Sequence, residues 1–208
     1  MLNFFEAHGT AYIVMDYVDG RDLDTILKES GPVDQHDLMR LLLPLLDGLA
    51  TIHRKSFLHR DIKPSNIMIQ DDTPVLIDFG AARQALGQSR SITSIVTPGY
   101  APIEQYSSSG GNQGPWTDIY ALGAVAYRAL TGKRPPDATD RYRKDPMVPA
   151  SVAARGRCHP KILEAIDWAL AVNEEDRPQS VEDWSAALLV AHEVRSGGEQ
   201  VGETRMTH

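Results

Sequence analysis

The chain has 208 residues and a formal net charge of −7, and 42% of its residues are hydrophobic and 24% charged. This length is sufficient for one domain, or for one large lobe with a tail, that buries a core of its own. The acidic balance argues against a general binder of nucleic acid or of anionic membranes, because that function needs clustered Lys and Arg. The local basic residues Arg141, Arg143 and Lys144 are interpreted as a solvated face.

Cysteine content and hydropathy restrict the class of protein further. Cys158 is the only cysteine, and one thiol cannot form a disulfide framework or a multi-cysteine zinc site. We therefore expect a reducing, cytoplasmic environment. No apolar run in the sequence approaches the ~20 residues that span a bilayer, and the N-terminus lacks the basic and apolar regions of a signal peptide.

The first predicted element is a strand over residues 11–18, an apolar and β-rich run between two glycine-containing turns. The segments next to it have no strand pattern, so we expect this strand to lack a sheet partner. Because even a two-stranded hairpin is only marginally stable alone, an unpaired apolar edge would be an aggregation hazard.

A long buried helix is predicted over residues 34–56, where Leu residues recur at helical spacing. Asp34 is its predicted N-cap, and Asp37 lies in the first turn, where the helix dipole favours a negative charge. Pro44 lies inside this run and should kink the helix or remove one hydrogen bond.

The remaining predicted elements alternate between short strands, polar loops and apolar helices. Gly132 follows the first of these helices and is a typical C-terminal stop. In chain order we predict strands at 66–69 and 75–77 with a turn between them, loops at 84–99 and 107–115, helices at 117–130, 161–172 and 181–194, and a disordered tail from Arg195.

Two motifs carry the chemistry, and their combination is highly specific. Residues 59–66 read His-Arg-Asp-Ile-Lys-Pro-Ser-Asn, and the triplet Asp78-Phe79-Gly80 begins twelve residues after Asn66, directly behind a predicted strand. These segments resemble the catalytic loop and the metal-binding triplet of protein kinases. Taken singly, each residue would more often be a turn, capping or core residue, so the interpretation rests on the combination.

The resemblance implies ATP- and Mg²⁺-dependent transfer of a phosphoryl group to Ser or Thr hydroxyls of a protein substrate. Asp61 would accept or orient the proton of the hydroxyl, and Lys63 would place a positive charge beside the transferring phosphate. Asn66 and Asp78 would supply the hard oxygen ligands that Mg²⁺ prefers. A lysine two residues after the catalytic aspartate resembles Ser/Thr kinases more than Tyr kinases.

Residues 96–104 extend the resemblance, because they are similar to the end of a kinase activation segment in the eukaryotic-like kinases of bacteria. Val96 departs from the pattern, since the family usually has glycine there. Thr97 would hydrogen-bond the catalytic aspartate and favour hydroxyl amino acids as substrate. Glu104 would form a buried ion pair with Arg177, and breaking one side of such a pair costs several kcal/mol.

Six further positions extend the resemblance without taking part in the chemistry. Asp118 resembles the helix aspartate that holds the catalytic-loop backbone, and Tyr120 stands where the family commonly has Trp. The resemblance implies that His59 and Phe79 pack in an internal hydrophobic column. Arg60 and Gly80 complete the two motifs.

The resemblance also places adenine beside residues 15–18, which match the kinase hinge. Met15 would be the gatekeeper, and the backbones of Asp16 and Val18 would bond the adenine edge. Asp22 falls where an acidic residue often contacts ribose, and Met68 would form the floor under adenine.

Regulation by phosphorylation is a further implication. An arginine before the catalytic aspartate, here Arg60, often accompanies phosphorylation of the activation loop in this family. A phosphate adds roughly −1.5 to −2 charge and could dock on Arg60. The candidate acceptors are Ser89, Ser91, Thr93 and Ser94, although for any single one an ordinary polar loop residue is the favoured interpretation.

The predicted fold class is α+β and mainly α, the large C-terminal lobe of a protein kinase with its hinge strand and with most of the small lobe absent. We assign residues 1–20 to the end of the small lobe and the hinge, 21–194 to the large lobe, and 195–208 to a polar tail. The family's Gly-rich loop, strand lysine and helix glutamate do not precede the hinge. We therefore expect a truncated reading frame, a mis-called start or a split gene, and we expect weak ATP binding and little transfer activity from this chain alone.

Three functions are compatible with these features. The first is a Ser/Thr protein kinase domain. The second is a catalytically inert kinase-fold module that binds or regulates a partner, including a complementary small-lobe chain. A small-molecule phosphotransferase of the same superfamily is weaker, because such enzymes usually lack both the Lys-Pro after the catalytic aspartate and a long activation segment.

Overall fold

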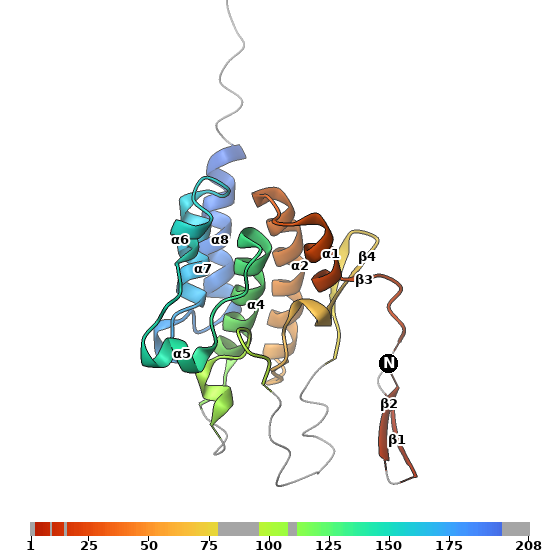
Figure 1. The fold of residues 1–208 in the computed structure, drawn as a ribbon. Coiled ribbons are helices and arrows are strands. Elements are labelled where there is room, and N and C mark those ends of the chain that lie inside the picture. Colours follow the sequence, from red (N-terminus) through yellow and green to blue (C-terminus); the bar gives the residue numbers. More distant parts are fainter. Residues whose placement is uncertain (1–2, 9, 15, 79–95, 108–111, 197–208) are drawn as a thin grey trace, which may run out of the picture.

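A computed structural model describes residues 3–8, 10–14, 16–78, 96–107 and 112–196. Most of these residues form a group of helices, and a small three-stranded sheet lies at one edge beside α1 and α2 (Figure 1). The predicted class, α+β and mainly α, is confirmed. Within the described part of the chain, none of the helices combines the length and apolar character that a membrane span requires.

The N-terminal residues form a hairpin, which corrects the prediction of an unpaired strand. β1 (Asn3–Ala7) pairs antiparallel with β2 (Thr10–Val14), so that Asn3 lies opposite Val14. The prediction missed β1, whose two adjacent phenylalanines have a strong strand preference. His8, with φ 52°, takes the left-handed conformation that tight hairpin turns need. The predicted strand also ended too late, because residues 16–19 have no regular structure.

The three-stranded sheet contains both strands that were predicted after the catalytic loop. β3 (Arg21–Asp22), β4 (Ile67–Gln70) and β5 (Thr73–Leu76) pair antiparallel in the order β3-β4-β5. The turn between β4 and β5 is made by Asp71 and Asp72, with φ 46° and 61°. Aspartate tolerates this left-handed conformation better than most residues, which explains why a short acidic turn joins the two strands.

Among the described residues, five helices of eight or more residues form the helical body. Two of the predicted helices, over 117–130 and 181–194, match to within two residues at each end. The predicted helices over 34–56 and 161–172 both end three residues earlier, at His53 and Ala169. The last helix runs two residues beyond its predicted end. In chain order the helices are α1 (Leu23–Ser30), α2 (Gln35–His53), α4 (Pro115–Thr131), α5 (Ala138–Arg143), α6 (Ala150–Ala153), α7 (Pro160–Ala169) and α8 (Val181–Ser196).

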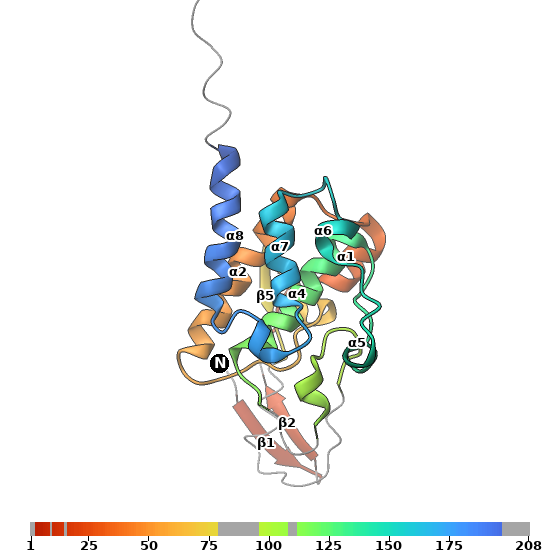
Figure 2. The ribbon, with the colours of Figure 1, turned by 90° about the vertical axis from the view of Figure 1, so that its left-hand side faces the viewer.

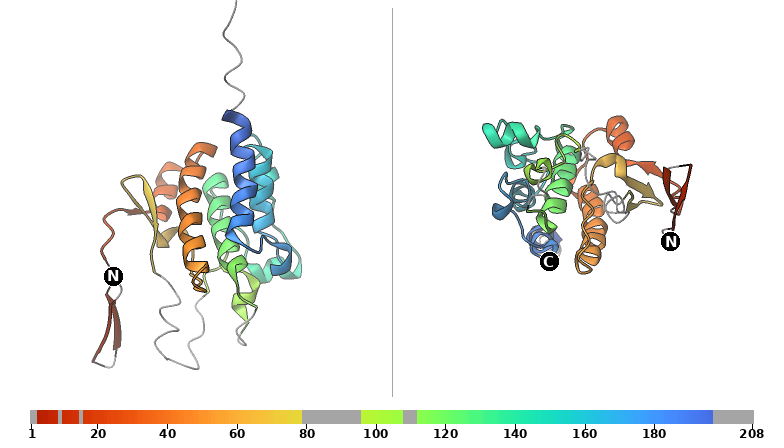
Figure 3. Two further views of the ribbon diagram at one scale, coloured as in Figure 1. Left: turned by 180° about the vertical axis from the view of Figure 1, so that it is seen from behind. Right: turned by 90° about the horizontal axis from the view of Figure 1, so that it is seen from below.

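The core is built around α4, which runs between α2 on one side and α7 and α8 on the other (Figure 3). Its residues from Thr117 to Tyr127 are all buried, as expected for a helix that is apolar on every face. Gly123 permits the close approach of α7, because a Cβ there would lie 3.0 Å from the Ala169 Cβ. The helix ends at Gly132, whose φ of 72° gives the predicted left-handed C-cap.

Candidate active site

The predicted catalytic loop lies where α2 ends and α4 begins, at the same end of the helical body (Figure 1). Asp61 is the centre of a polar cluster there. Lys63 Nζ lies 2.9 Å from Asp61 Oδ2, and Asn66 Nδ2 donates to the same oxygen over 3.0 Å. Thr97 Oγ1 donates to Asp61 Oδ1 over 3.2 Å. The predicted contact between Thr97 and this aspartate is therefore present.

The Asp61 carboxylate remains accessible inside this cluster. Its side chain is 32% exposed, and that of Lys63 is 25% exposed. A carboxylate offers about four acceptor positions, and Lys63, Asn66 and Thr97 use three of them. A hydroxyl from a substrate can therefore still donate a hydrogen bond to Asp61.

Asn66 and Asp78 are held close to this cluster by backbone hydrogen bonds. The buried Asn66 lies in the short 3₁₀ helix η1 (Pro64–Asn66), and its main-chain oxygen accepts from Ile77 N over 2.9 Å. Its side-chain nitrogen makes the bonds to Asp61, which leaves the amide oxygen Oδ1 for a cation. Asp78 follows Ile77 and is exposed, with φ 58°. One amide and one carboxylate oxygen fit the hard-oxygen preference of Mg²⁺.

Asp118 positions the catalytic loop from the first turn of α4, as predicted. Its buried carboxylate accepts hydrogen bonds from the backbone nitrogens of His59 and Arg60, each over 2.8 Å. Arg60 has φ 67°, a conformation that a non-glycine residue rarely adopts and that its surroundings must hold in place. The two bonds to Asp118 supply that support.

His53, at the end of α2, is a third partner of Asp118 that the sequence analysis missed. Its Nε2 lies 2.8 Å from Asp118 Oδ2, and its side chain is almost fully buried. Its other ring nitrogen, Nδ1, has no hydrogen-bond partner among the described residues. The proton is therefore assigned to Nε2, which donates it to Asp118. The histidine carried no motif signal, because its partner is 65 residues away in the sequence.

His59 connects the catalytic loop to the segment that leads to Asp78. Its Nε2 lies 3.0 Å from Ile77 O, and its Nδ1 accepts from Asp61 N over 3.3 Å. Burial lowers the pKa of His59, although the negative charges of Asp118 and Asp61 act in the opposite direction. A neutral imidazole that donates from one nitrogen and accepts at the other fits the predicted structural role.

The predicted ion pair between Glu104 and Arg177 is present and almost completely buried. Arg177 donates to both carboxylate oxygens, over 2.8 and 3.2 Å, and Thr117 Oγ1 donates to Glu104 over 2.9 Å. The guanidinium also lies over the Tyr120 ring, 4.7 Å from its centroid. The aromatic residue that replaces the family's Trp thus packs on this pair.

Gln105 is a second functional position that sequence reasoning missed. It lies in the 3₁₀ helix η2 (Ile103–Tyr106), and its Nε2 donates to Arg60 O over 2.7 Å. This bond joins the end of the activation segment to the catalytic loop. In the sequence, Gln105 is marked only by its position next to Glu104. That position does not predict which residue the Gln105 side chain contacts.

The residues predicted to bind the nucleotide lie around β3 and β4. Met68 in β4 pairs with Asp22 in β3, and both are half-buried. Asp22 also caps α1, because its two carboxylate oxygens accept from Thr25 N and Oγ1 over 2.9 and 2.7 Å. A contact with ribose would have to use the acceptor positions that remain on these oxygens. Asp16 is exposed and Val18 half-buried in the irregular segment before β3.

Several predicted site residues cannot be placed, because they lie outside the described part of the chain. They are the gatekeeper Met15, the two motif residues Phe79 and Gly80, and the candidate phosphorylation sites Ser89, Ser91, Thr93 and Ser94.

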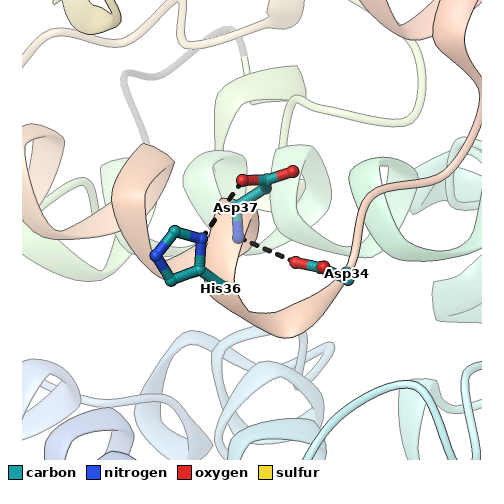
Figure 4. A group of neighbouring side chains, drawn as sticks. All are labelled: Asp34, His36 and Asp37. Atoms are coloured by element: carbon teal, nitrogen blue, oxygen red, sulfur yellow. Dashed lines mark hydrogen bonds and ion pairs between the residues drawn. The ribbon is translucent and has the colours of Figure 1, made fainter.

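Another group of potential metal ligands occurs at the start of α2, where Asp34, His36 and Asp37 lie close together (Figure 4). All three are exposed. Asp34 accepts from Asp37 N over 2.9 Å, which is the predicted helix cap, and His36 Nδ1 lies 3.4 Å from Asp37 Oδ1. A helix of this length places the group about 27 Å from the catalytic-loop end. Helix capping accounts for its geometry.

Comparison with known proteins finds similarity to protein kinases over nearly the whole chain. A family model described as "Protein kinase domain" matches residues 1–192. The chain is 34% identical over 194 residues to the serine/threonine-protein kinase PknA of Nostoc sp., which covers 89% of this chain and 34% of PknA. It is 34% identical over 172 residues to PknL of Mycobacterium tuberculosis, covering 80% of this chain and 43% of PknL. It therefore spans less than half the length of these relatives.

The fold of this chain is also similar to solved structures. The structure described as "PpkA-294 apo form" superposes with a TM-score of 0.76 at 41% identity, covering 90% of this chain and 66% of that one. The PknI kinase domain of Mycobacterium tuberculosis superposes with a TM-score of 0.70 at 25% identity, covering 92% of this chain and 70% of that domain.

Proposed function

Because this chain belongs to the protein kinase domain family, among relatives that are bacterial serine/threonine kinases, we propose that it transfers the γ-phosphoryl group of ATP to Ser or Thr side chains of proteins. The observation that carries this proposal is the cluster in which Lys63, Asn66 and Thr97 all contact the accessible carboxylate of Asp61. Phosphoryl transfer needs mainly positioning and charge neutralisation, and this cluster is suited to both.

In the proposed reaction, Asp61 accepts a hydrogen bond from the substrate hydroxyl and orients it for attack. Thr97 holds the other carboxylate oxygen, so the carboxylate keeps one orientation. Lys63 stays beside Asp61 and offers its positive charge to the phosphoryl group as negative charge spreads over its oxygens.

Asn66 Oδ1 and the Asp78 carboxylate are the groups that would hold Mg²⁺. Mg²⁺ held there would supply positive charge to neutralise the phosphate groups. The hydrogen bond from Ile77 N to Asn66 O ties the two ligand-bearing segments together. The bond from His59 to Ile77 O fixes the same segment to the catalytic loop, so a displacement of one ligand is resisted by both.

The nucleotide would bind on the side of β3 and β4. The backbones of Asp16 and Val18 would pair with the adenine edge, with Met68 under the ring and Asp22 near the ribose. This part of the proposal rests on the family resemblance and on the adjacency of Met68 and Asp22 in the sheet.

The first experiment is calorimetry of ATP binding to the purified chain with and without Mg²⁺. We expect binding that depends on Mg²⁺ and is lost in Asp78→Ala. The matched control is Asp47→Ala, because Asp47 is an exposed aspartate on α2. Transfer of ³²P to a Ser- or Thr-containing protein should be lost in Asp61→Asn, while ATP binding persists.

The outcomes separate the two main functions. Binding and transfer that both depend on these aspartates would support an active kinase domain. A folded chain that binds no ATP and transfers no phosphate would contradict catalysis by this chain and favour the kinase-fold binding module, including one that needs a complementary small lobe.

A further inference from the structure

The turn at residues 97–100 begins beside Asp61, the proposed catalytic aspartate. Thr97 contacts Asp61, and the backbone nitrogens of Tyr100 and Ala101 both donate to Thr97 O, over 3.1 and 3.0 Å. A substrate that presents its hydroxyl to Asp61 advances about 3.3–3.6 Å per residue when extended. If the substrate runs along this turn, side chains one to three residues from the accepting Ser or Thr lie beside it.

The outer wall of the turn is formed by Arg134 and Pro135, just after the end of α4. Gly99 has φ 83°, and a Cβ at this position would lie 2.7 Å from Pro135 O and 3.3 Å from Arg134 Cδ. The stem of Arg134 thus packs directly on the turn. Its guanidinium lies 3.4 Å from Pro98 O, a long hydrogen bond that leaves most of the five N–H donors available.

The charge of Arg134 is not neutralised within the described part of the chain. Arg134 is exposed, and no described carboxylate oxygen lies within 4.0 Å of its guanidinium. The two nearby acidic groups have other partners. Asp24 pairs with both Arg128 and Lys28, and Asp137 accepts from Tyr106 and caps α5 beside η2 (Figure 2).

The field of Arg134 reaches Tyr100 within the turn and Tyr106 after it. Burial raises the pKa of Tyr100 and of Tyr106, and the positive charge of Arg134 opposes the rise in both. The exposed Lys133 adds a second cation next to Arg134. In a chain of net charge −7, this is a local cationic surface beside the proposed acceptor site.

We propose that Arg134, assisted by Lys133, selects protein substrates that carry an acidic side chain one to three residues from the phosphorylated Ser or Thr. This inference rests on the proposed kinase function and specifies the class of substrate. A guanidinium has the planar donor geometry that matches a carboxylate. Arg134 acts through contact with the substrate and has no part in the transfer of the phosphoryl group.

The test uses peptides with one acceptor residue and with Glu, Gln or Lys at the flanking positions. We expect the Glu peptide to have a KM about fivefold lower than the Lys peptide at similar kcat, the range of an exposed ion pair. The preference should shrink as ionic strength rises. Arg134→Glu should reverse it, whereas Arg157→Glu, which changes an exposed arginine on a distant loop, should leave the order unchanged.

A binding measurement without ATP keeps this inference separate from the proposed function. Fluorescence anisotropy would follow the same peptides with Ala in place of the acceptor. In one outcome the Glu peptide binds more tightly than the Lys peptide, with this order reversed in Arg134→Glu, while no phosphate is transferred to the matching peptides that carry the acceptor. That result would support the selectivity of Arg134 and reject catalysis by this chain. Transfer at equal KM for the Glu and Lys peptides would overturn the selectivity alone. A result in which phosphoserine improves peptide binding and Glu does not would also overturn the proposed selectivity for acidic side chains.

Discussion

The catalytic loop and the nucleotide-side segment at residues 16–22 are held in place in different ways. The loop is tied by buried polar bonds to distant elements, to Asp118 on α4, Gln105 in η2 and Ile77 after β5. In the described part of the chain, the Asp22 side chain accepts hydrogen bonds from Thr25, which is three residues away. Tyr17 in the same segment is 87% exposed.

The two halves of the proposed site therefore differ in what supports them. The half proposed to accept the hydroxyl is fixed by the tertiary structure, because its strained backbone at Arg60 needs external support. The nucleotide side is supported by a two-residue strand and a helix cap. We therefore expect substitutions in the supports of the catalytic loop to have larger effects than those in the nucleotide-side segment.

The largest effect is expected from breaking the buried ion pair. Arg177→Met leaves the Glu104 carboxylate buried without its partner, and the free energy of unfolding should fall by about 4 kcal/mol. Urea denaturation measures the change. Arg157→Met, at an exposed position, should change it by about 0.5 kcal/mol or less. A loss for Arg177→Met no larger than this control would show that the pair does not support the fold.

The next largest effect is expected at Asp118. In Asp118→Asn, one oxygen that accepts from the loop becomes a donor, so the free energy of unfolding should fall by about 3 kcal/mol. Hydrogen exchange should speed up at the amides of His59 and Arg60, which bond to this carboxylate. The control Asp47→Asn should leave their protection unchanged. Unchanged protection in Asp118→Asn would contradict the positioning role.

A smaller effect is expected from pH, through His59. Burial lowers its pKa in the folded chain, so below about pH 6.5 the unfolded chain binds this proton more readily. The contribution of His59 to stability is complete above that pH and is lost as pH falls toward the folded pKa. The slope should reach at most about 1.4 kcal/mol per pH unit.

Unfolding measured between pH 5 and 7 tests this expectation, with the pH range taken from the ordinary pKa of His. His59→Phe should flatten the slope, and His36→Gln, at an exposed position, should not. Equal slopes for the original chain and His59→Phe would contradict a neutral, buried His59.

The smallest effect is expected at the nucleotide-side segment. Asp22→Ala removes the cap of α1 and should cost about 1 kcal/mol in thermal unfolding, whereas the exposed Asp19→Ala should cost much less. The hydrogen bonds from Thr25 lower the pKa of Asp22. Its contribution is therefore complete above its ordinary value of 3.8 and is lost as pH falls through the lower folded pKa. If the stability of the original chain does not fall in this acid range, the capping role of Asp22 is contradicted.

The elements that the sequence predicted well have strong local signals. Leu spacing and Asp34 placed α2, and Gly132 placed the end of α4. The elements that the prediction missed have weak local signals. β1 has only five residues before its turn, and the short helix α5 is stabilised by contacts that Arg141 makes with Tyr120 and Asp145. Such contacts between separate elements leave no periodic pattern.

The sequence by itself determined which residues carry the proposed chemistry, because phosphoryl transfer needs particular residue types at short fixed spacings, and Asp61, Lys63, Asn66 and Asp78 occur at those spacings. Only the tertiary structure decided how these residues are held. His53 contacts Asp118, which is 65 residues away in the sequence, and Gln105 reaches Arg60 from 45 residues away. Arg134 packs on the turn at 97–100 because α4 ends beside it. A local motif specifies which groups are present, whereas burial and long-range contacts specify where they point.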